Sequence, residues 1–394
     1  MKWRGRAVGV AIVVVGLGMT AITPGWAVPW DGLGIATPGE VSPPVQPDPE
    51  CIQNYATDAP AGGTPVVWGI GPMESGGGGA QQTTPFTPED RERADQALRQ
   101  LKPTGKPFVV RLNRMFSADG EDGIARYKAL VDRYTALGLQ VELQVRYHPE
   151  PADNGNIDKW LDYVRRAVDV FGANPGVTGL QITNEVNITI SANTSDGYYL
   201  DAEQALVRGV IEAKKQARLR NYSQLGIGFN YAVLQPWLSF AGSTAGFWRD
   251  IGALGGAEFR DSVDWIGFDY YPQGRIPPKL VDPYNSMVQA MALVRKCYLP
   301  LAGFAGRTPL HIDEVGWATG THGTEDAQRD ALDAIVRAIN DYRGNYGISE
   351  AYWFDLRDNN SSSPKYEDYY GLLRDDYTSK PAFDRYQQLV AEYS

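Results

Sequence analysis

The chain has 394 residues, of which 43% are hydrophobic and 11% aromatic, so it can bury the core of one large domain or two small ones. Its formal net charge at pH 7 is −10. Such an acidic chain disfavours nucleic acid and anionic membranes as partners and is compatible with neutral ligands.

Residues 1–27 have the organisation of a secretory signal peptide. Lys2, Arg4 and Arg6 are basic, residues 7–22 are uncharged, and residues 25–27 form a small-x-small cleavage site. The apolar run is shorter than the ~20 residues of a membrane span, which favours secretion over the alternative of a retained anchor. Cleavage removes three positive charges and changes the net charge from −10 to −13. We expect an extracellular or cell-wall-associated protein with no membrane contact in its mature form.

Residues 28–64 are rich in Pro and Gly and predict an extended N-terminal arm before a catalytic domain at 65–394. The only cysteines are Cys51 and Cys297. In an exported chain, two cysteines predict one disulfide, here between the arm and the helix before the seventh strand. The alternative is a pair of buried free thiols.

From residue 65 onward, short apolar strands alternate with amphipathic helices. The predicted strands are 66–72, 108–115, 140–147, 177–183, 225–231, 263–270, 310–315 and 349–356. The first helix is expected to begin with Thr87 as N-cap and Pro88 at its first position, and the others at 123–137, 157–171, 202–219, 247–254, 283–299, 325–342 and 380–393.

Eight such alternations in about 330 residues predict an α/β fold, the (β/α)8 TIM barrel. An open doubly wound sheet is the alternative, but it normally carries a G-x-G-x-x-G phosphate turn. The glycines at 76–79 lack that spacing and are not followed closely by a helix.

Several predicted strands carry polar residues on one face near their carboxyl ends, including Arg111, His148, Asp269 and Tyr271. Parallel strands buried on both faces are normally apolar throughout, and barrel active sites lie at the carboxyl ends of the strands. These polar positions therefore predict a functional site.

Two glutamates end strands on opposite sides of the predicted barrel. Glu185 follows the fourth strand in QITNEVN, and Glu314 ends the seventh in LHIDEVGW. Glycosidic hydrolysis needs one acid to protonate the leaving oxygen and one carboxylate to meet the oxocarbenium-like carbon. A single strand-end glutamate is usually an ion-pair partner, but this pairing of positions is more specific.

From Pro65 to the C-terminus the chain resembles the clan A glycoside hydrolases. Asn184-Glu185 matches the Asn-Glu dipeptide of their fourth strand, and Glu314-Val315-Gly316-Trp317 matches the seventh-strand nucleophile followed by Gly and an aromatic residue. The closing stretch YYGLLRDDYTSKPAFDRY is also similar to the end of such barrels. The resemblance implies that Glu185 is the acid/base and Glu314 the nucleophile of a retaining mechanism. No single family within the clan can be assigned.

The resemblance also implies supporting roles for other residues. Asn184 is expected to hold the sugar 2-hydroxyl, and Arg111 and Tyr271, with Tyr270 as second choice, are expected beside the nucleophile. The remaining expected substrate-binding residues are His148, Asp269 (a position that is often His in cellulase-type members), Trp317 and Trp353, the last as a sugar platform.

A poly- or oligosaccharide is therefore the expected partner of a monomeric chain that needs no cofactor. The three histidines show no metal-ligand spacing, so no catalytic metal is expected, and His311 is interpreted as structural because it alternates away from Glu314. A Ser-His-Asp hydrolase is disfavoured because the G-x-S-x-G motif is missing. Two alternatives share these residues: a transglycosidase that remodels a cell-wall or exopolysaccharide glycan, and a catalytically silent polysaccharide-binding barrel.

Overall fold

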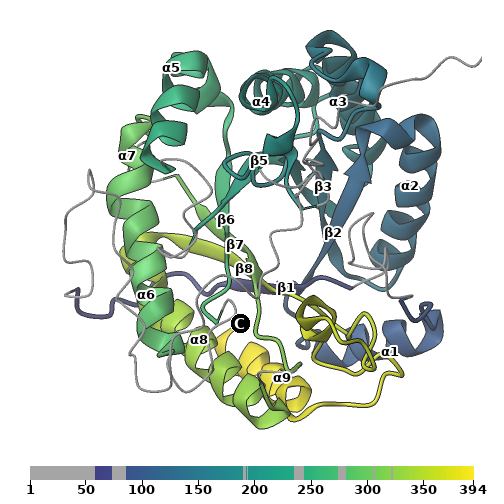
Figure 1. Cartoon of the computed structure of the whole chain (residues 1–394), viewed down its shortest axis with the longest axis vertical. Coiled ribbons are helices and arrows are strands. Elements are labelled where there is room, and N and C mark those ends of the chain that lie inside the picture. Colours follow the sequence, from purple (N-terminus) through teal and green to yellow (C-terminus); the bar gives the residue numbers. More distant parts are fainter. Residues whose placement is uncertain are drawn as a thin grey trace, which may run out of the picture. The chain divides into compact units, whose positions relative to one another are not determined.

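The fold is a closed parallel barrel of eight strands, β1 to β8, each paired with the next and β8 with β1 (Figure 1). The computed structural model describes residues 58–72, 86–189, 192, 194–234, 244–273, 281–304, 306, 308–320 and 323–394. The strands are β1 (Val67–Ile70), β2 (Val109–Phe116), β3 (Gln140–Arg146), β4 (Val177–Ile182), β5 (Gly226–Ala232), β6 (Trp265–Tyr270), β7 (Leu310–Val315) and β8 (Ile348–Trp353). This confirms the predicted TIM barrel.

Helices surround the strands in the described part of the chain (Figure 1). The α-helices are α1 (Arg91–Leu101), α2 (Gly120–Ala136), α3 (Ile157–Phe171), α4 (Ala202–Leu219), α5 (Thr244–Ser262), α6 (Pro283–Leu293), α7 (Leu299–Leu301), α8 (Glu325–Tyr346) and α9 (Pro381–Tyr393). The shorter elements are the 3₁₀ turns η3 (Ser117–Asp119), η4 (Pro151–Asp153), η5 (Asp196–Tyr198) and η8 (Tyr366–Tyr369) and the π-helical turn η7 (Val294–Tyr298).

The helices form where apolar residues recur at helical spacing behind a capping residue. In α3, Trp160, Val164 and Phe171 lie on the buried face, and the Asn156 side chain caps the start by accepting from the Lys159 backbone N–H. Both α3 and α4 have the bounds that the sequence predicts.

The first helix begins later than expected, at Arg91. The Asp90 side chain caps α1 by accepting from the backbone N–H of Arg93, 3.2 Å away. Thr87 is not the cap, because its hydroxyl donates to Asp375 instead, at 2.6 Å.

Four strands each place a glycine against a large side chain on a neighbouring strand. A Cβ at any of these glycines would lie only 1.8 to 2.9 Å from the neighbouring atom. The pairs are Gly69 with Tyr352, Gly179 with Glu142, Gly228 with Trp265 and Gly267 with Asp313. The absence of a side chain at these glycines therefore leaves space for the large side chains of the neighbouring strands.

β7 departs from regular strand alternation. Its register shifts relative to β6 between Phe268 and Asp269, and relative to β8 between Ile312 and Val315. Such an irregularity re-aims side chains. As a result, His311 and Glu314 both contact residues of the barrel interior, which corrects the interpretation that His311 points away from Glu314.

Residues 58–64 pack along the carboxyl end of α8. The backbone N–H of Gly344 donates to the carbonyl of Ala61 at 3.1 Å, and the Tyr342 hydroxyl donates to the carbonyl of Asp58 at 3.1 Å. The signal peptide, most of the expected arm and Cys51 lie outside the described residues, so the domain limits and the disulfide stay predictions. Cys297 is buried in η7. Among the described helices, none has the length and hydropathy to cross a bilayer.

Candidate active site

Glu314 lies at the end of β7 with a strong donor on each carboxylate oxygen. The Arg111 guanidinium of β2 donates to Oε1 at 2.8 Å as an ion pair, and the Tyr271 hydroxyl, just after β6, donates to Oε2 at 2.6 Å. Charge-assisted bonds of this kind fix a carboxylate in both position and orientation. Both contacts are those that the sequence predicts, and Tyr271 rather than Tyr270 makes the second.

Glu185 follows β4 on a strained stretch of backbone. Its φ is +46° and that of Thr183 is +65°, in the left-handed region that residues with a side chain rarely adopt. The strain is offset by specific bonds: the Glu185 N–H donates to Asn230 Oδ1 at 3.0 Å, and the Ser195 hydroxyl donates to Glu185 Oε2 at 3.2 Å. Desolvation of its carboxyl group, followed by the charge of Glu314, raises the pKa of Glu185 to about 8.

A network of amides and one acid lies beside the two glutamates. Asn184 Oδ1 accepts from Gln144 at 2.7 Å and from Asn230 at 2.9 Å, while its Nδ2 donates to the Thr194 carbonyl at 2.8 Å. Asn230 also donates to Asp269 Oδ2 at 2.6 Å. These bonds hold the Asn184 amide in one orientation.

Asp269 is fully buried in this network. Burial, and then the negative charges of Glu314 and Glu185, raise the pKa of Asp269 well above its usual range. The charge of Asp269 is therefore coupled to the charges of both glutamates. A proton shared among the three carboxyl groups is favoured over three negative charges.

The backbone after β4 is anchored by Asp196, which the sequence analysis missed. Its buried carboxylate accepts from Arg146 Nε at 2.6 Å and from the backbone N–H groups of Tyr147 and Asn184 at 2.8 and 2.9 Å. Asp196 begins η5, fourteen residues beyond the end of β4 at Ile182, so no strand-end pattern marks it. Asn230 was also missed, although it is a polar residue near the carboxyl end of β5.

His148 follows β3 and Trp317 follows β7, and neither has a hydrogen bond or ion pair with Glu185 or Glu314 in the described part of the chain. The His148 ring packs between Phe116 and Tyr199, with centroids 4.5 and 5.0 Å away, and burial followed by Arg146 lowers the pKa of His148 to about 4. Trp317 is buried, with 1% of its surface exposed. Among the described residues Trp317 therefore has no open ring face for a ligand, whereas His148 is partly exposed.

Trp353 is on the helix-facing side of β8, which corrects its expected orientation. Its ring lies 6.4 Å from that of Tyr386 in α9, and only 1% of the residue is exposed. The reason is strand alternation, since Tyr352 is the β8 residue that points into the barrel and contacts Glu142 there. The aromatic residue beside the site is Phe354, which is partly exposed and packs edge-on against Tyr271 at 5.9 Å.

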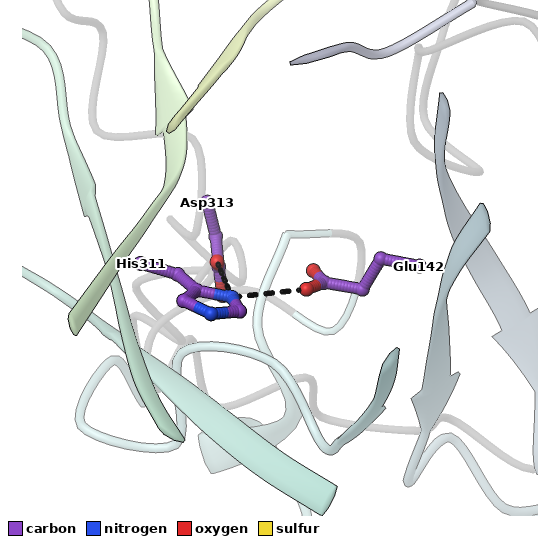
Figure 2. Close-up of side chains that lie close together, drawn as sticks. All are labelled: Glu142, His311 and Asp313. Carbon is purple, nitrogen blue, oxygen red and sulfur yellow. Dashed lines mark hydrogen bonds and ion pairs between the residues drawn. The ribbon is translucent and has the colours of Figure 1, made fainter. Parts of the chain in front are cut away.

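Arg111 connects Glu314 to a second group of charges inside the barrel. Its Nη2 donates to Gln181 at 2.7 Å, and its Nε lies 3.4 Å from Glu142 Oε1. Glu142 in turn contacts His311 Nδ1 at 3.2 Å (Figure 2). Although burial opposes the charged imidazolium, Glu350 and Glu142 raise the pKa of His311 to about 9.

Solved structures similar to this chain include β-glucosidases. The Thermotoga maritima β-glucosidase in complex with noeuromycin is 14% identical with a TM-score of 0.58, and the alignment covers 84% of this chain and 99% of that one. A β-glucosidase from Exiguobacterium marinum is 16% identical with a TM-score of 0.57, over 84% of this chain and 99% of that one. At these identities the likeness shows a shared barrel fold. No protein-family model and no protein of curated function matches the sequence.

Proposed function

We propose that this chain is a retaining glycoside hydrolase that cleaves O-glycosidic bonds in a poly- or oligosaccharide. The observation that carries the proposal is the contrast between two glutamates at the carboxyl ends of β4 and β7. Glu314 accepts from a guanidinium and a phenol, whereas Glu185 has a pKa near 8. A carboxylate and a carboxylic acid in one site are what a double displacement requires.

In the first step, Glu314 attacks the anomeric carbon while Glu185 gives its proton to the departing glycosidic oxygen. The sugar is then bonded to Glu314 as an ester, and Glu185 is a carboxylate. In the second step, Glu185 takes a proton from water, whose oxygen attacks the anomeric carbon and releases Glu314. Two inversions give net retention of configuration.

The neighbouring side chains fit these roles. Arg111 and Tyr271 hold the attacking carboxylate of Glu314 and receive it again when the ester breaks. The Asn184 amide gives one hydrogen to Thr194, and the second, which has no acceptor among the described residues, can bind a sugar hydroxyl. Phe354 supplies an apolar ring beside Tyr271 against which a sugar face can pack. The similar folds are those of β-glucosidases, which supports a carbohydrate substrate.

The experiment is a screen of the purified protein on a panel of polysaccharides and oligosaccharides with reducing-end detection, followed by NMR of the first-formed anomer. We expect new reducing ends of retained configuration on at least one substrate. A first product of inverted configuration would show that Glu314 does not act as a nucleophile. Longer products formed only with added acceptor sugar would identify a transglycosidase, and binding without any product would identify a silent barrel.

We further propose that the chain is secreted and that Cys51 and Cys297 form a disulfide. Lys296, the neighbour of Cys297, pairs with Asp58, and Tyr346 also donates to Asp58 at 2.9 Å. Asp58 is seven residues after Cys51, which limits their separation to about 24 Å. Thiol titration of denatured, unreduced protein should find no free thiol, and two thiols per chain would contradict the proposal.

A further inference from the structure

Three titratable side chains meet inside the barrel, away from the proposed sugar-cleaving pair. Glu142 comes from β3, and His311 and Asp313 come from β7 (Figure 2). Nδ1 of His311 lies 3.2 Å from Glu142 Oε2 and 4.0 Å from Asp313 Oδ1, and one ligand atom from each residue lies within 4.8 Å of the others. All three residues are buried.

Asp313 is the member of this cluster that needs an explanation. Its side chain has no exposed surface, and neither carboxylate oxygen has a hydrogen-bond partner among the described residues. A buried carboxylate without donors is costly, and native structures normally satisfy such groups. Gly267 leaves the space that this carboxylate occupies, since a Cβ there would lie 1.8 Å from Asp313 Oδ2.

The donor set is that of a divalent transition-metal ion. One imidazole nitrogen and two carboxylate oxygens are ligands that Zn²⁺ takes at about 2.0–2.2 Å, which places the ligand atoms of a tetrahedral site about 3.4 Å apart. The separations of 3.2 and 4.0 Å are close to that spacing. Three protein ligands leave one coordination position open.

The side chains around the cluster contact the three proposed ligands in the way that neighbouring residues support metal-bound side chains. Glu142 Oε1 lies 3.4 Å from Arg111 Nε, while Oε2 accepts from the Tyr352 hydroxyl at 3.1 Å and faces His311, so an ion would share this oxygen with the tyrosine. The second ring nitrogen of His311, Nε2, lies 3.8 Å from the Glu350 carboxylate, and the ring stacks on Trp265 at 4.2 Å. Metal-bound histidines commonly direct their other nitrogen to a carboxylate, which fixes the ring.

A pocket of about 400 Å³ reaches Glu142 and His311, and Asp313 lies behind them, outside the residues that line the pocket. The pocket is lined by Glu142, His311, Trp265 and Glu350, together with Gly226 and Pro309, which lie at or just before the amino ends of β5 and β7. An ion can therefore enter at the amino-terminal end of the barrel, opposite the strand ends that carry Glu185 and Glu314.

We propose that Glu142, His311 and Asp313 form a divalent metal site, of the kind that binds Zn²⁺, which braces β3 against β7 from inside the barrel. The ion is structural, and this inference goes beyond the proposed function because it does not depend on what the sugar site cleaves. Binding of the ion gives the Asp313 carboxylate a direct ligand contact in place of the hydrogen bonds that it lacks among the described residues.

The test is a calorimetric titration of the full chain with Zn²⁺ after removal of metals by a chelator. We expect one ion per chain, with the affinity lowered at least about 10-fold by the near-isosteric Asp313→Asn and by His311→Gln. The matched control is Glu314→Gln, which removes the neighbouring carboxylate on the same strand and should leave zinc binding unchanged. Anomalous X-ray scattering at the zinc edge should place the ion between β3 and β7.

Three results of this experiment would overturn the proposal. Less than one ion per chain in the wild-type protein overturns the proposal, and so does full affinity in both ligand variants. Loss of zinc binding in Glu314→Gln but not in the two ligand variants would show that the ion binds at the sugar site. This result would also overturn the proposal. If Asp313→Asn fails to fold, the His311→Gln variant and the anomalous signal of the wild-type crystal still decide the matter.

Discussion

Replacing Glu185 with alanine tests the acid/base assignment most directly. A pKa of about 8 keeps Glu185 mostly protonated at pH 7, whereas a glutamate with the ordinary value near 4.5 would be mostly ionised. The environment of Glu185 thus favours the acid that protonates a leaving group. General acid catalysis contributes about 10²- to 10⁴-fold, so Glu185→Ala should lose that factor on a natural oligosaccharide.

The assay compares kcat/KM against pH for that oligosaccharide and for a nitrophenyl glycoside. Glu185 acts in its protonated form, so wild-type activity is present below pH 8 and lost as the pH rises through that value. Glu185→Ala should lose this alkaline limb on the nitrophenyl substrate, whose leaving group needs no proton. Azide should then restore turnover and give a glycosyl azide of retained configuration.

Glu150→Ala is the matched control, because Glu150 is an exposed glutamate that follows β3 in the chain. It should keep the wild-type profile. Equal losses on natural and activated substrates, with no azide rescue, would show that Glu185 is not the acid/base. An alkaline limb that persists in Glu185→Ala would assign the pKa near 8 to another group.

The remaining predictions concern the nucleophile and the packing. Glu314→Ala should abolish turnover of every substrate, activated ones included, and full activity on a nitrophenyl glycoside would contradict its role. Tyr271→Phe removes one hydrogen bond to Glu314, worth about 1.5–3 kcal/mol, and should lower kcat roughly 10- to 100-fold. An unchanged kcat would count against the contact. Gly267→Ala should destabilise the fold by about 1–3 kcal/mol, because its Cβ would meet Asp313 at 1.8 Å, whereas Gly306→Ala, with open space around it, should leave thermal unfolding unchanged.

The barrel and the two contacts of Glu314 could be predicted from the sequence. Local apolar runs and caps determine strands and helices, and a barrel brings polar strand ends to one face. The resemblance to clan A enzymes implied Arg111 and a tyrosine beside Glu314, and parity favoured Tyr271 over Tyr270. The same parity argument failed where backbone geometry is irregular. The register shift of β7 against β6, which skips Asp313, brings Glu314 onto the same side as His311, and no local residue pattern marks it.

Other parts of the candidate site depend on contacts between distant residues. Glu142 and His311 are 169 residues apart, so their meeting follows from closure of the barrel rather than from any motif. Asp196 acts from η5, beyond the strand that it anchors. Trp353 was misplaced because the position facing the barrel on β8 belongs to Tyr352.

The interior glycines have a consequence for how this sequence can change. Each gives its space to one large partner, so the volume at such a pair is shared between two strands. A larger residue at position 267 is tolerable only if the residue at position 313 becomes smaller. Related sequences should therefore show compensating exchanges at these pairs, and a saturation-mutagenesis library that varies both members together should recover folded combinations that neither single library contains.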